Sequence, residues 1–562
     1  MSRRLVLLAI VLGVLVTALL SIGHREVGYV RDEGIYFAAS RSYAAWFGDL
    51  VRQPGKTLGR AERDRRFRTN HEHPALLKSL AGLSARLLAR PPAAGSEEPG
   101  IRDDGGVLPV MDEGAAMRLP AQLSTALAVA LLFLAASRWW GVGAGVLAAG
   151  SFILLPQVWF YAGLHAFDVP VAVAMLVVVL AYRRALHSRG WALALGPIVG
   201  VAIAVKHNAL FLGPLLALHY WTCLLLARVR EGRPIARGQW IPLPLVSMGL
   251  SSLPVAVALW PWLWSDTWAR IAEYVTFHRA HAYYNMEFLG TNYNQPPMPI
   301  AYPWVMTWAS VPSVILVIAA LGLALGLRAE LARDREPSTE LARGGFVIAL
   351  PGGWARHDTL LFAMMAVFPL VLIALPSTPI FGGTKHWITA YPFMALLSAR
   401  AWPWLWSRLT DVRTARLEPL ALAVVLGPAA IATIDGHPYG MSQYAPLVGG
   451  ARGAASLGLN RGFWGHAIVR ELPRLPELMG DATRLYAHDL DGLAQRQYVR
   501  EGRWPAGIEM VPLSRAQAGL FFHELHMATW EYQLWEQLGT TAPVDVVTLD
   551  GVPLTSVYAR KP

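Results

Sequence analysis

The first apolar run, "RRLVLLAIVLGVLVTALLSIG" (residues 3–23), carries no charged residue after Arg4. A run of this length can cross the hydrocarbon core of a bilayer, which needs about 20 apolar residues in a helix. It has a basic start but no clear small-x-small cleavage site, which predicts a retained signal-anchor helix. Similar runs recur along a chain in which only 15% of residues are charged. The sequence therefore predicts a polytopic α-helical membrane protein.

The apolar runs divide the chain into about eleven predicted spans. They are residues 4–22, 119–137, 141–161, 168–185, 190–206, 209–227, 241–260, 304–327, 359–376, 386–405 and 417–434. Separating 190–206 from 209–227 depends on "KHNA" (206–209), because Lys, His and Asn at mid-bilayer depth are costly. Many of the 22 tryptophans stand near the ends of these runs, as in interfacial aromatic belts.

Arginines are concentrated in alternate short loops, at 138, 183–189, 228–237, 328–356 and 408–416. Because short cytoplasmic loops carry an excess of Lys and Arg, this pattern places the N-terminus in the cytoplasm. The net charge of +11 is explained by this topology better than by nucleic-acid binding.

Three polar regions then fall on the outer face. They are the loops 23–117 and 261–303, which belong to a transmembrane domain of residues 1–434, and a soluble C-terminal domain of residues 435–562. Within the last, residues 543–559 have a strand-like pattern and residues 515–539 a helix-like one. This region predicts a small α/β or α+β domain.

Adjacent carboxylates follow the first span, in "VGYVRDEGIYFAAS" (27–40). Asp32 and Glu33 begin a segment with the spacing of an amphipathic helix. Capping of that helix, favoured by its dipole, would explain one of the two acids. A catalytic role is the alternative.

Four more polar clusters fall on the same predicted face. They are "TNHEHPALLK" (69–78) with Glu72, His73 and Lys78; "GLHAFDVPVAV" (163–173) with His165 and Asp168; "VKHNAL" (205–210) with Lys206 and His207; and "GGTKHWITAYP" (383–392) with Lys385 and His386. The structural alternatives are a helix cap for Asp168 and interfacial lysines for the two Lys-His pairs. His73 and Glu72 are the candidate ligands of a divalent metal, although "HEH" is a weak metal signal because residues 71 and 73 diverge on a helix.

Carboxylates and cations beside a bilayer predict a site for a lipid-linked phosphate. A carboxylate can take the proton of an acceptor hydroxyl while cations stabilise the departing phosphate. This combination favours group transfer over cation transport.

The motifs, taken in order, resemble the GT-C glycosyltransferases, and among them the protein O-mannosyltransferase and aminoarabinose-transferase group. The matching stretches are "RDEGIYFAASRSY", "NHEHPALLK", "AMRLPAQL" (116–123), "FDVPVAV", residues 281–312 and residues 437–465. The resemblance implies a GT-C fold and transfer of a sugar from a polyprenyl-phosphate donor to a hydroxyl of a protein, lipid or envelope glycan. It also implies a bacterial inner-membrane location, with the active site and the C-terminal domain on the periplasmic side.

The resemblance also implies roles for individual residues. Asp32 would be the catalytic base, Glu33 would support it or bind the acceptor, and Asp168 would be a second acid near the active centre. Glu72, His73 and Lys78 match a motif associated with the lipid phosphate or a nearby metal; Lys206, His207, Lys385 and His386 would be further phosphate contacts. The sequence departs from the family pattern at His71 and Ala75, where a small residue and a second proline are expected.

Two other classes of function remain open at this stage. A transporter or flippase of lipid-linked sugars would use the same cations to bind phosphate. A membrane scaffold would use the C-terminal domain to bind a partner and would tolerate loss of Asp32.

Overall fold

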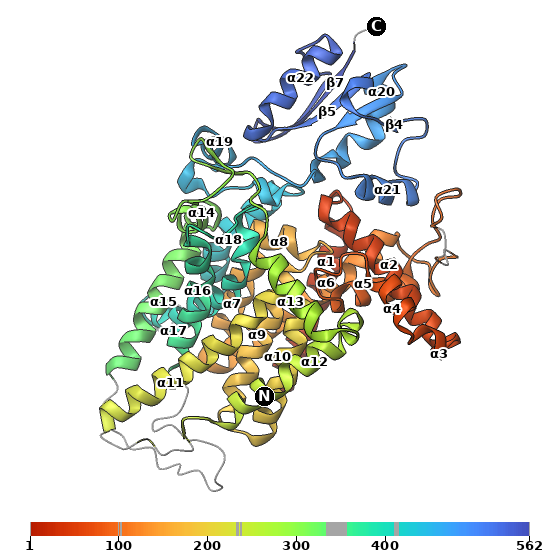
Figure 1. Cartoon of the computed structure of the whole chain (residues 1–562). Helices are drawn as coiled ribbons and strands as arrows, with labels where there is room; N and C mark the ends of the chain where they lie inside the picture. Colours follow the sequence, from red (N-terminus) through yellow and green to blue (C-terminus); the bar gives the residue numbers. More distant parts are fainter. Residues whose placement is uncertain are drawn as a thin grey trace.

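A computed structural model describes residues 2–98, 101, 104–231, 235, 239–332, 357–409 and 415–560. It consists of a helical bundle with a small mixed sheet at one end (Figure 1). The first half contains α1 (Arg3–Gly23), α2 (Arg31–Arg52), α3 (Pro54–Thr57), α4 (Arg60–Phe67), α5 (Leu76–Leu88), α6 (Glu113–Trp140), α7 (Val142–Ile153), α8 (Pro156–Ala162), α9 (Asp168–Ala185), α10 (Arg189–Val205), α11 (Leu212–Glu231), α12 (Leu243–Ala258) and α13 (Thr267–Arg279).

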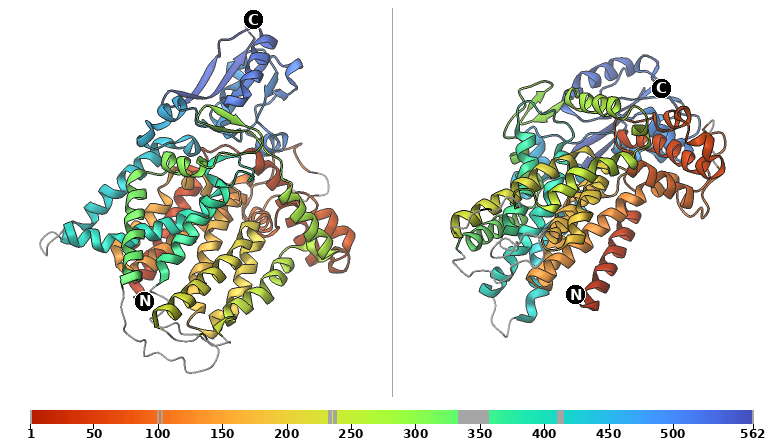
Figure 2. Two further views of the ribbon diagram at one scale, coloured as in Figure 1. Left: turned by 60° about the vertical axis from the view of Figure 1, so that its left-hand side comes forward. Right: turned by 60° about the horizontal axis from the view of Figure 1, so that its bottom comes forward.

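The second half of the bundle contains α14 (Tyr302–Ser310), α15 (Ser313–Ala332), α16 (Asp358–Ala374), α17 (Tyr391–Leu409) and α18 (Glu418–Gly436). A two-stranded hairpin, β1 (Met286–Phe288) and β2 (Thr291–Tyr293), lies in the loop between α13 and α14. The N-terminal end of α1 and the C-terminal sheet lie at opposite ends of the molecule (Figure 2).

Five helical stretches among the described residues are long and apolar enough to cross a membrane: Arg3–Gly23, Glu113–Trp140, His207–Val229, Ser313–Leu331 and Glu418–Gly436. The pair α7 and α8, bent by 71°, could form a sixth. Each predicted span falls on a helix or on a pair of consecutive helices, but several of these are shorter or more polar. The count of eleven therefore stays a prediction. Much of the Arg-rich loops 228–237, 328–356 and 408–416 lies outside the described residues.

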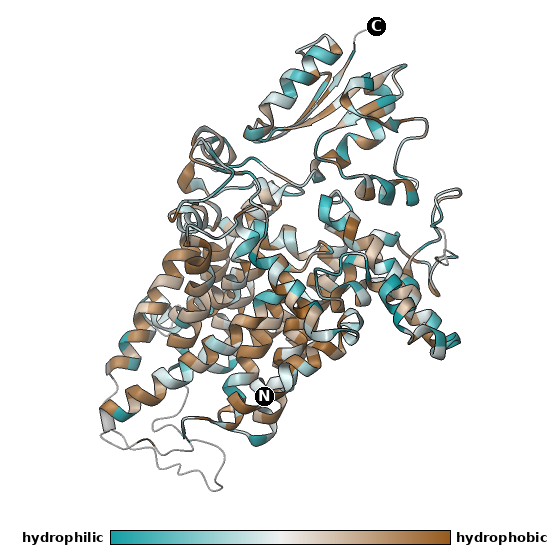
Figure 3. Cartoon of the chain, in the orientation of Figure 1, coloured by the Kyte–Doolittle hydropathy of each residue, from teal (hydrophilic) through white to brown (hydrophobic). Residues whose placement is uncertain are grey.

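The helices of the bundle consist largely of hydrophobic residues (Figure 3), many of which are exposed. Helix α1 illustrates this, because Leu7, Val11, Val14 and Ile22 are each more than 60% exposed whereas Leu20 is fully buried. Soluble proteins rarely leave so continuous an apolar surface in water. The exposed side of α1 is therefore suited to contact lipid, and the protein is a membrane protein.

The predicted break at "KHNA" is confirmed. Helix α10 ends at Val205, and a 3-10 turn, η1 (His207–Phe211), separates it from α11. Lys206 stands at the break with an extended backbone. The polar residues of this segment therefore lie between two helices rather than in the middle of one.

The C-terminal part contains a five-stranded sheet in the order β4-β3-β5-β7-β6. Its elements are α19 (Gly450–Ser456), α20 (Leu475–Met479), β3 (Arg484–Ala487), α21 (Gly492–Arg500), β4 (Glu509–Met510), β5 (Ala518–Phe522), α22 (Ala528–Leu538), β6 (Asp545–Leu549) and β7 (Val552–Ala559). Strand β3 pairs in parallel with β4 and β5, whereas β7 pairs antiparallel with β5 and β6.

The helical prediction for 515–539 is wrong in its first half. Residues 518–522 form β5, the central strand of the sheet, and all five are buried. A short apolar run that is buried on both faces has the same composition in a strand as in a buried helix. The strand-like pattern of 543–559 is confirmed as the hairpin β6–β7.

The C-terminal part packs directly on the start of α2. A Cβ atom at Gly34 would lie 2.4 Å from the backbone nitrogen of Ala494 in α21. The hydroxyl of Tyr498 accepts a hydrogen bond of 2.6 Å from the backbone N–H of Tyr29. The turn that carries Asp32 is thus held against the C-terminal part.

We expect Gly34→Ala to loosen this contact, because the added methyl group overlaps backbone atoms that cannot move without shifting α21. Overpacking of this kind costs about 1–3 kcal/mol. The purified variant should melt earlier and be cut sooner by protease within residues 435–562. Gly55→Ala is the matched control, since no atom lies within 4 Å of a Cβ placed there. Equal protease resistance of the two variants would contradict this account of the contact.

Candidate active site

A buried ion pair lies at the start of α2. The side chains of Glu33 and Arg118 are 0% and 3% exposed, and their two hydrogen bonds measure 2.7 and 2.6 Å. Glu33 also accepts hydrogen bonds from the backbone N–H groups of Val30, at 3.1 Å, and His165, at 2.8 Å. The bond to Val30 caps α2, as the structural alternative for one of the two acids predicted. Glu33 is therefore enclosed by protein. Of the two roles that the resemblance implies, support of Asp32 or contact with an acceptor, only the first is compatible with this burial.

Arg118 completes this arrangement by donating to the backbone carbonyls of His24, Val27 and Gly28 at 2.9–3.0 Å. These carbonyls belong to the turn between α1 and α2, so Arg118 fixes the path of the chain into the site. No role was predicted for Arg118. The signal was present in "AMRLPAQL", where a lone arginine stands at the start of an apolar span.

Asp32, the next residue in α2, faces a different environment. Its side chain is 27% exposed, and among the described residues its one ion-pair contact is with Arg31 at 3.9 Å. Arg31 itself lies 3.2 Å from Asp489 of the C-terminal part. Asp32 is therefore accessible, and the described residues give it no ion-pair contact shorter than 3.9 Å.

Asp168 and Lys206 form a second ion pair of the site, with 2.6 Å between Oδ1 and Nζ. Asp168 is the first residue of α9, one position after the N-cap residue Phe167. Its side chain accepts a hydrogen bond from Lys206, so a helix cap, one of the two alternatives for this residue, does not account for its contact. Because Lys206 stands at the break after α10, the pair connects the ends of two neighbouring helices.

Lys385 adds a positive charge near the ion pair of Asp168 and Lys206. It lies in a 3-10 turn, η5 (Gly383–His386), and is 8% exposed. Its ammonium group lies 3.7 Å from the centre of the Trp464 ring. Burial lowers the pKa of Lys385 to about 8, and the nearby carboxylates of Asp32 and Asp168 oppose that shift. Asp32, Asp168, Lys206 and Lys385 thus form one electrostatic group, which we call the phosphate-side cluster.

The histidines of the two Lys-His pairs make contacts of their own. The Nε2 atom of His386 contacts the backbone of Phe381, which fixes the turn. The ring of His207 lies 4.1 Å from that of His278 in α13. His278 was not predicted as a site residue, although the sequence placed it in an outer loop.

Lys78 is buried in its own loop. Its ammonium group donates to the backbone carbonyls of Asn70 and His73 and to the side chain of Asn70. Burial lowers its pKa to about 7. Helix α5 begins at Leu76, two residues after Pro74, and Lys78 points back from it to the preceding turn. Its contacts thus organise the 70–73 turn, and the predicted contact with phosphate would require them to break.

Glu72 and His73 lie in the turn before α5, where the ring of His73 is 6.1 Å from that of Tyr36. Glu72 accepts a hydrogen bond of 2.7 Å from Asn70, and the ring of His73 lies 5.5 Å from that of Phe167. His71 turns instead toward Trp262, at 4.6 Å, so the two histidines diverge as expected. The described residues contain no group of three or more His, Cys, Asp or Glu side chains that could hold a metal ion.

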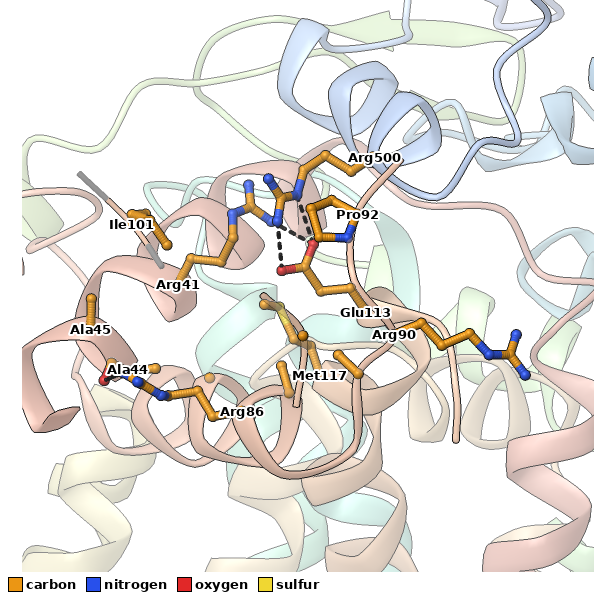
Figure 4. A pocket seen from close by; sticks show the side chains of 14 residues that line it. Arg41, Ala44, Ala45, Arg86, Arg90, Pro92, Ile101, Glu113, Met117 and Arg500 are labelled. Atoms are coloured by element: carbon orange, nitrogen blue, oxygen red, sulfur yellow. Dashed lines mark hydrogen bonds and ion pairs between the residues drawn. The ribbon is translucent and has the colours of Figure 1, made fainter. Parts of the chain in front are cut away.

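A separate pocket lies between α2, α5, α6 and α21 (Figure 4). Arg41 and Arg500 both contact the carboxylate of Glu113, with N···O distances of 3.4 and 2.8 Å. Arg41 also lies 2.7 Å from Glu98. This network joins the C-terminal part to the first loop, at a place distinct from the phosphate-side cluster.

Comparison with known proteins gives one match to a protein family. Residues 107–262 match the family described as dolichyl-phosphate-mannose-protein mannosyltransferase. The matched segment runs from the loop before α6 to the 3-10 turn after α12 and contains Arg118, Asp168 and Lys206. This match confirms the resemblance to the protein O-mannosyltransferase group.

Two solved structures are similar to the chain over nearly its whole length. One is ArnT from Cupriavidus metallidurans in the apo state, with 16% sequence identity, a TM-score of 0.47, and coverage of 98% of this chain and 97% of that chain. The other is the same protein bound to undecaprenyl phosphate, with 16% identity, a TM-score of 0.44 and the same coverage. The comparison with curated proteins gives no match.

We expect Glu33→Gln to destabilise the protein strongly, because it leaves the charge of Arg118 buried without its carboxylate. Breaking a buried ion pair from one side costs about 3–5 kcal/mol. The melting temperature and the yield of folded protein in detergent should both fall. Glu26→Gln is the matched control, since the Glu26 side chain is 68% exposed. A melting temperature equal to that of the control would refute the structural role of the pair.

Proposed function

We propose that this protein is a membrane glycosyltransferase that moves a sugar from a polyprenyl phosphate to an acceptor hydroxyl. The reaction takes place at the end of the bundle that carries the C-terminal sheet, which we assign to the outer face of the membrane. The family match supports a phosphate-linked sugar donor, and the Arg distribution in the sequence supports the orientation.

The observation that carries the proposal is that a partly exposed carboxylate, Asp32, and a buried ammonium group, Lys385, belong to one electrostatic group. The carboxylate is partly exposed and lacks a close ion-pair partner, whereas the ammonium group is buried among aromatic rings. The reaction requires a base, which takes a proton from the acceptor, and a cation, which stabilises the leaving phosphate. A carboxylate and an ammonium group can fill these two roles.

The atoms of the proposed step balance without a further reactant. Asp32 accepts the proton of the acceptor hydroxyl as its oxygen forms a bond to the anomeric carbon of the donor. The bond from that carbon to the phosphate oxygen breaks, and its electron pair remains on the phosphate beside Lys385. Attack from the face opposite the phosphate inverts the anomeric centre.

Asp168 and Lys206 contribute to the proposed site as an ion pair. Their ion pair holds Lys206 at the end of α10 and keeps a second cation near Lys385. When the donor phosphate enters, Lys206 can contact it while remaining paired with Asp168, because an ammonium group has three donors. Asp168 is thus a positioning residue in this proposal, and Asp32 is the base.

We expect Asp32→Asn to lower transfer by at least about 100-fold, because general-base catalysis contributes about 10²–10⁴-fold. The test is transfer of radiolabelled sugar from a polyprenyl phosphate to envelope material by purified protein in proteoliposomes. The variant should keep the melting temperature of the wild type, since the Asp32 side chain is partly exposed. Normal transfer by a folded Asp32→Asn protein would exclude Asp32 as the base.

We also expect donor affinity to fall as the pH rises above about 8. Lys385 loses its charge in that range because burial lowers its pKa to about 8, and the neutral amine no longer attracts phosphate. The measurement is binding of a polyprenyl phosphodiester between pH 7 and 10, where the lipid itself does not titrate. In the matched variant Lys385→Arg, which stays charged throughout, the affinity should be constant. A decline of equal slope in both proteins would exclude Lys385 as its cause.

A further inference from the structure

Two carboxyl groups of the C-terminal sheet lie at the edge that faces the start of α2. Asp489 comes two residues after β3, and Glu524 two residues after β5. Because β3 and β5 pair in parallel, their carboxyl ends lie at the same edge of the sheet. The Asp489 side chain is 5% exposed, and its Oδ1 lies 3.2 Å from Nη1 of Arg31. The sheet thus places a buried carboxylate against the residue that directly precedes Asp32.

The carboxyl groups of Asp489 and Glu524 are hydrogen-bonded to each other. Oδ2 of Asp489 and Oε1 of Glu524 are buried, and no N–H or hydroxyl group of the described residues donates to them. A hydrogen bond between two carboxyl groups needs a proton on one of them. Burial and the charge of Asp489 raise the pKa of Glu524 well above its usual value. Glu524 therefore carries the proton, and Asp489 is the ionised member of the pair at neutral pH.

His526 links this pair to the loop between α13 and α14. It lies in the 3-10 turn η13 (Leu525–Met527), with Nδ1 3.0 Å from Glu287 of β1 and Nε2 3.3 Å from Glu524. The charged and titratable groups that face the pair are Arg31, Asp32, Glu287, His466, His488, His523 and His526. Arg31 is the permanently charged cation of this set, and it is the ion-pair partner of Asp489.

Arg31 stands between two carboxylates. Its Nη1 lies 3.2 Å from Asp489, whereas its Nε lies 3.9 Å from Asp32, and only the first distance allows a hydrogen bond. The backbone N–H of Arg31 donates to the carbonyl of Trp464 at 3.0 Å, which fixes its main chain. Its side chain is 47% exposed and can turn. Because a guanidinium binds a carboxylate best through two parallel bonds, Arg31 can serve either acid fully but not both.

We propose that Asp489 is a positioning residue, which holds the guanidinium of Arg31 away from Asp32 and leaves the proposed base open to an acceptor hydroxyl. The inference rests on the proposed function and adds a group that controls its base. Without the charge of Asp489, Arg31 turns to Asp32. A carboxylate held by a guanidinium is a weaker base, and its oxygens are covered.

The first experiment measures sugar transfer at pH 7.5 by four proteins in proteoliposomes: wild type, Asp489→Asn, Arg31→Gln and the double variant. Asp489→Asn should lower transfer about tenfold, because charge-assisted hydrogen bonds from Arg31 must break before Asp32 accepts a proton. Arg31→Gln should keep transfer near the wild-type level and should restore it in the double variant. Low transfer by the double variant, full transfer by Asp489→Asn, or a loss in Arg31→Gln alone would each overturn the inference.

The rescue in the double variant separates positioning from a structural role. A structural defect caused by Asp489→Asn would persist in the double variant, since removal of the Arg31 side chain repairs no contact. Asp481→Asn is the matched control, because Asp481 is an exposed acid just before β3 in the same sheet domain. It should transfer sugar as the wild type does. The melting temperature of each variant in detergent shows whether it is folded.

The pH profile provides the second experiment. Burial raises the pKa of Asp489 to about 6, and Arg31 opposes the shift. Below that pH, Asp489 becomes protonated and releases Arg31, so the wild type comes to resemble Asp489→Asn. The ratio of wild-type to Asp489→Asn transfer should therefore fall from about tenfold at pH 7.5 toward one at pH 5. A ratio that stays constant over this range would contradict the proposed competition for Arg31.

The wild type separates this inference from the proposed function. If the wild type transfers sugar and the double variant shows no rescue, the inference alone fails. If the wild type transfers no sugar at any pH, the proposed function fails and the inference fails with it.

Discussion

Arg118 makes five hydrogen bonds, two to Glu33 and three to carbonyls of the turn that leads into α2. Burial of a charge is tolerated only when it is paired and hydrogen-bonded, and this turn supplies both to the buried guanidinium. The pair therefore fixes where α2 begins. Every distance from Asp32 to its surroundings depends on that starting point.

The C-terminal part holds the same turn from the opposite side. Tyr498 binds the backbone of Tyr29, and Asp489 lies beside Arg31, so the residues on both sides of the turn contact the sheet domain or its helix α21. Burial raises the pKa of Asp489 to about 6, with Arg31 opposing the shift. The residue before the proposed base is thus tied to a carboxyl group of the C-terminal part. The site is formed by two parts of the chain more than 400 residues apart.

Sequence predicted the helical segments because hydropathy is a local property. It also predicted which clusters would carry charge near the outer end. It could not distinguish Lys78 from Lys385, since both stand near histidines at a predicted boundary. Packing separates them: Lys78 is surrounded by the carbonyls of its own loop, whereas Lys385 lies against Trp464, a residue 79 positions later. The sequence could not show which lysine its own loop would enclose, because that depends on how the chain packs.

Asp32 and Glu33, the neighbouring acids of α2, also have different surroundings that only the packing of the chain reveals. Successive residues in an α-helix point about 100° apart, so adjacent carboxylates need not share surroundings. Glu33 turns inward and pairs with the buried guanidinium of Arg118, which fixes the turn. Asp32 stays partly exposed at the surface of the same helical turn. One acid thus positions the start of α2, and its neighbour is left accessible to an acceptor.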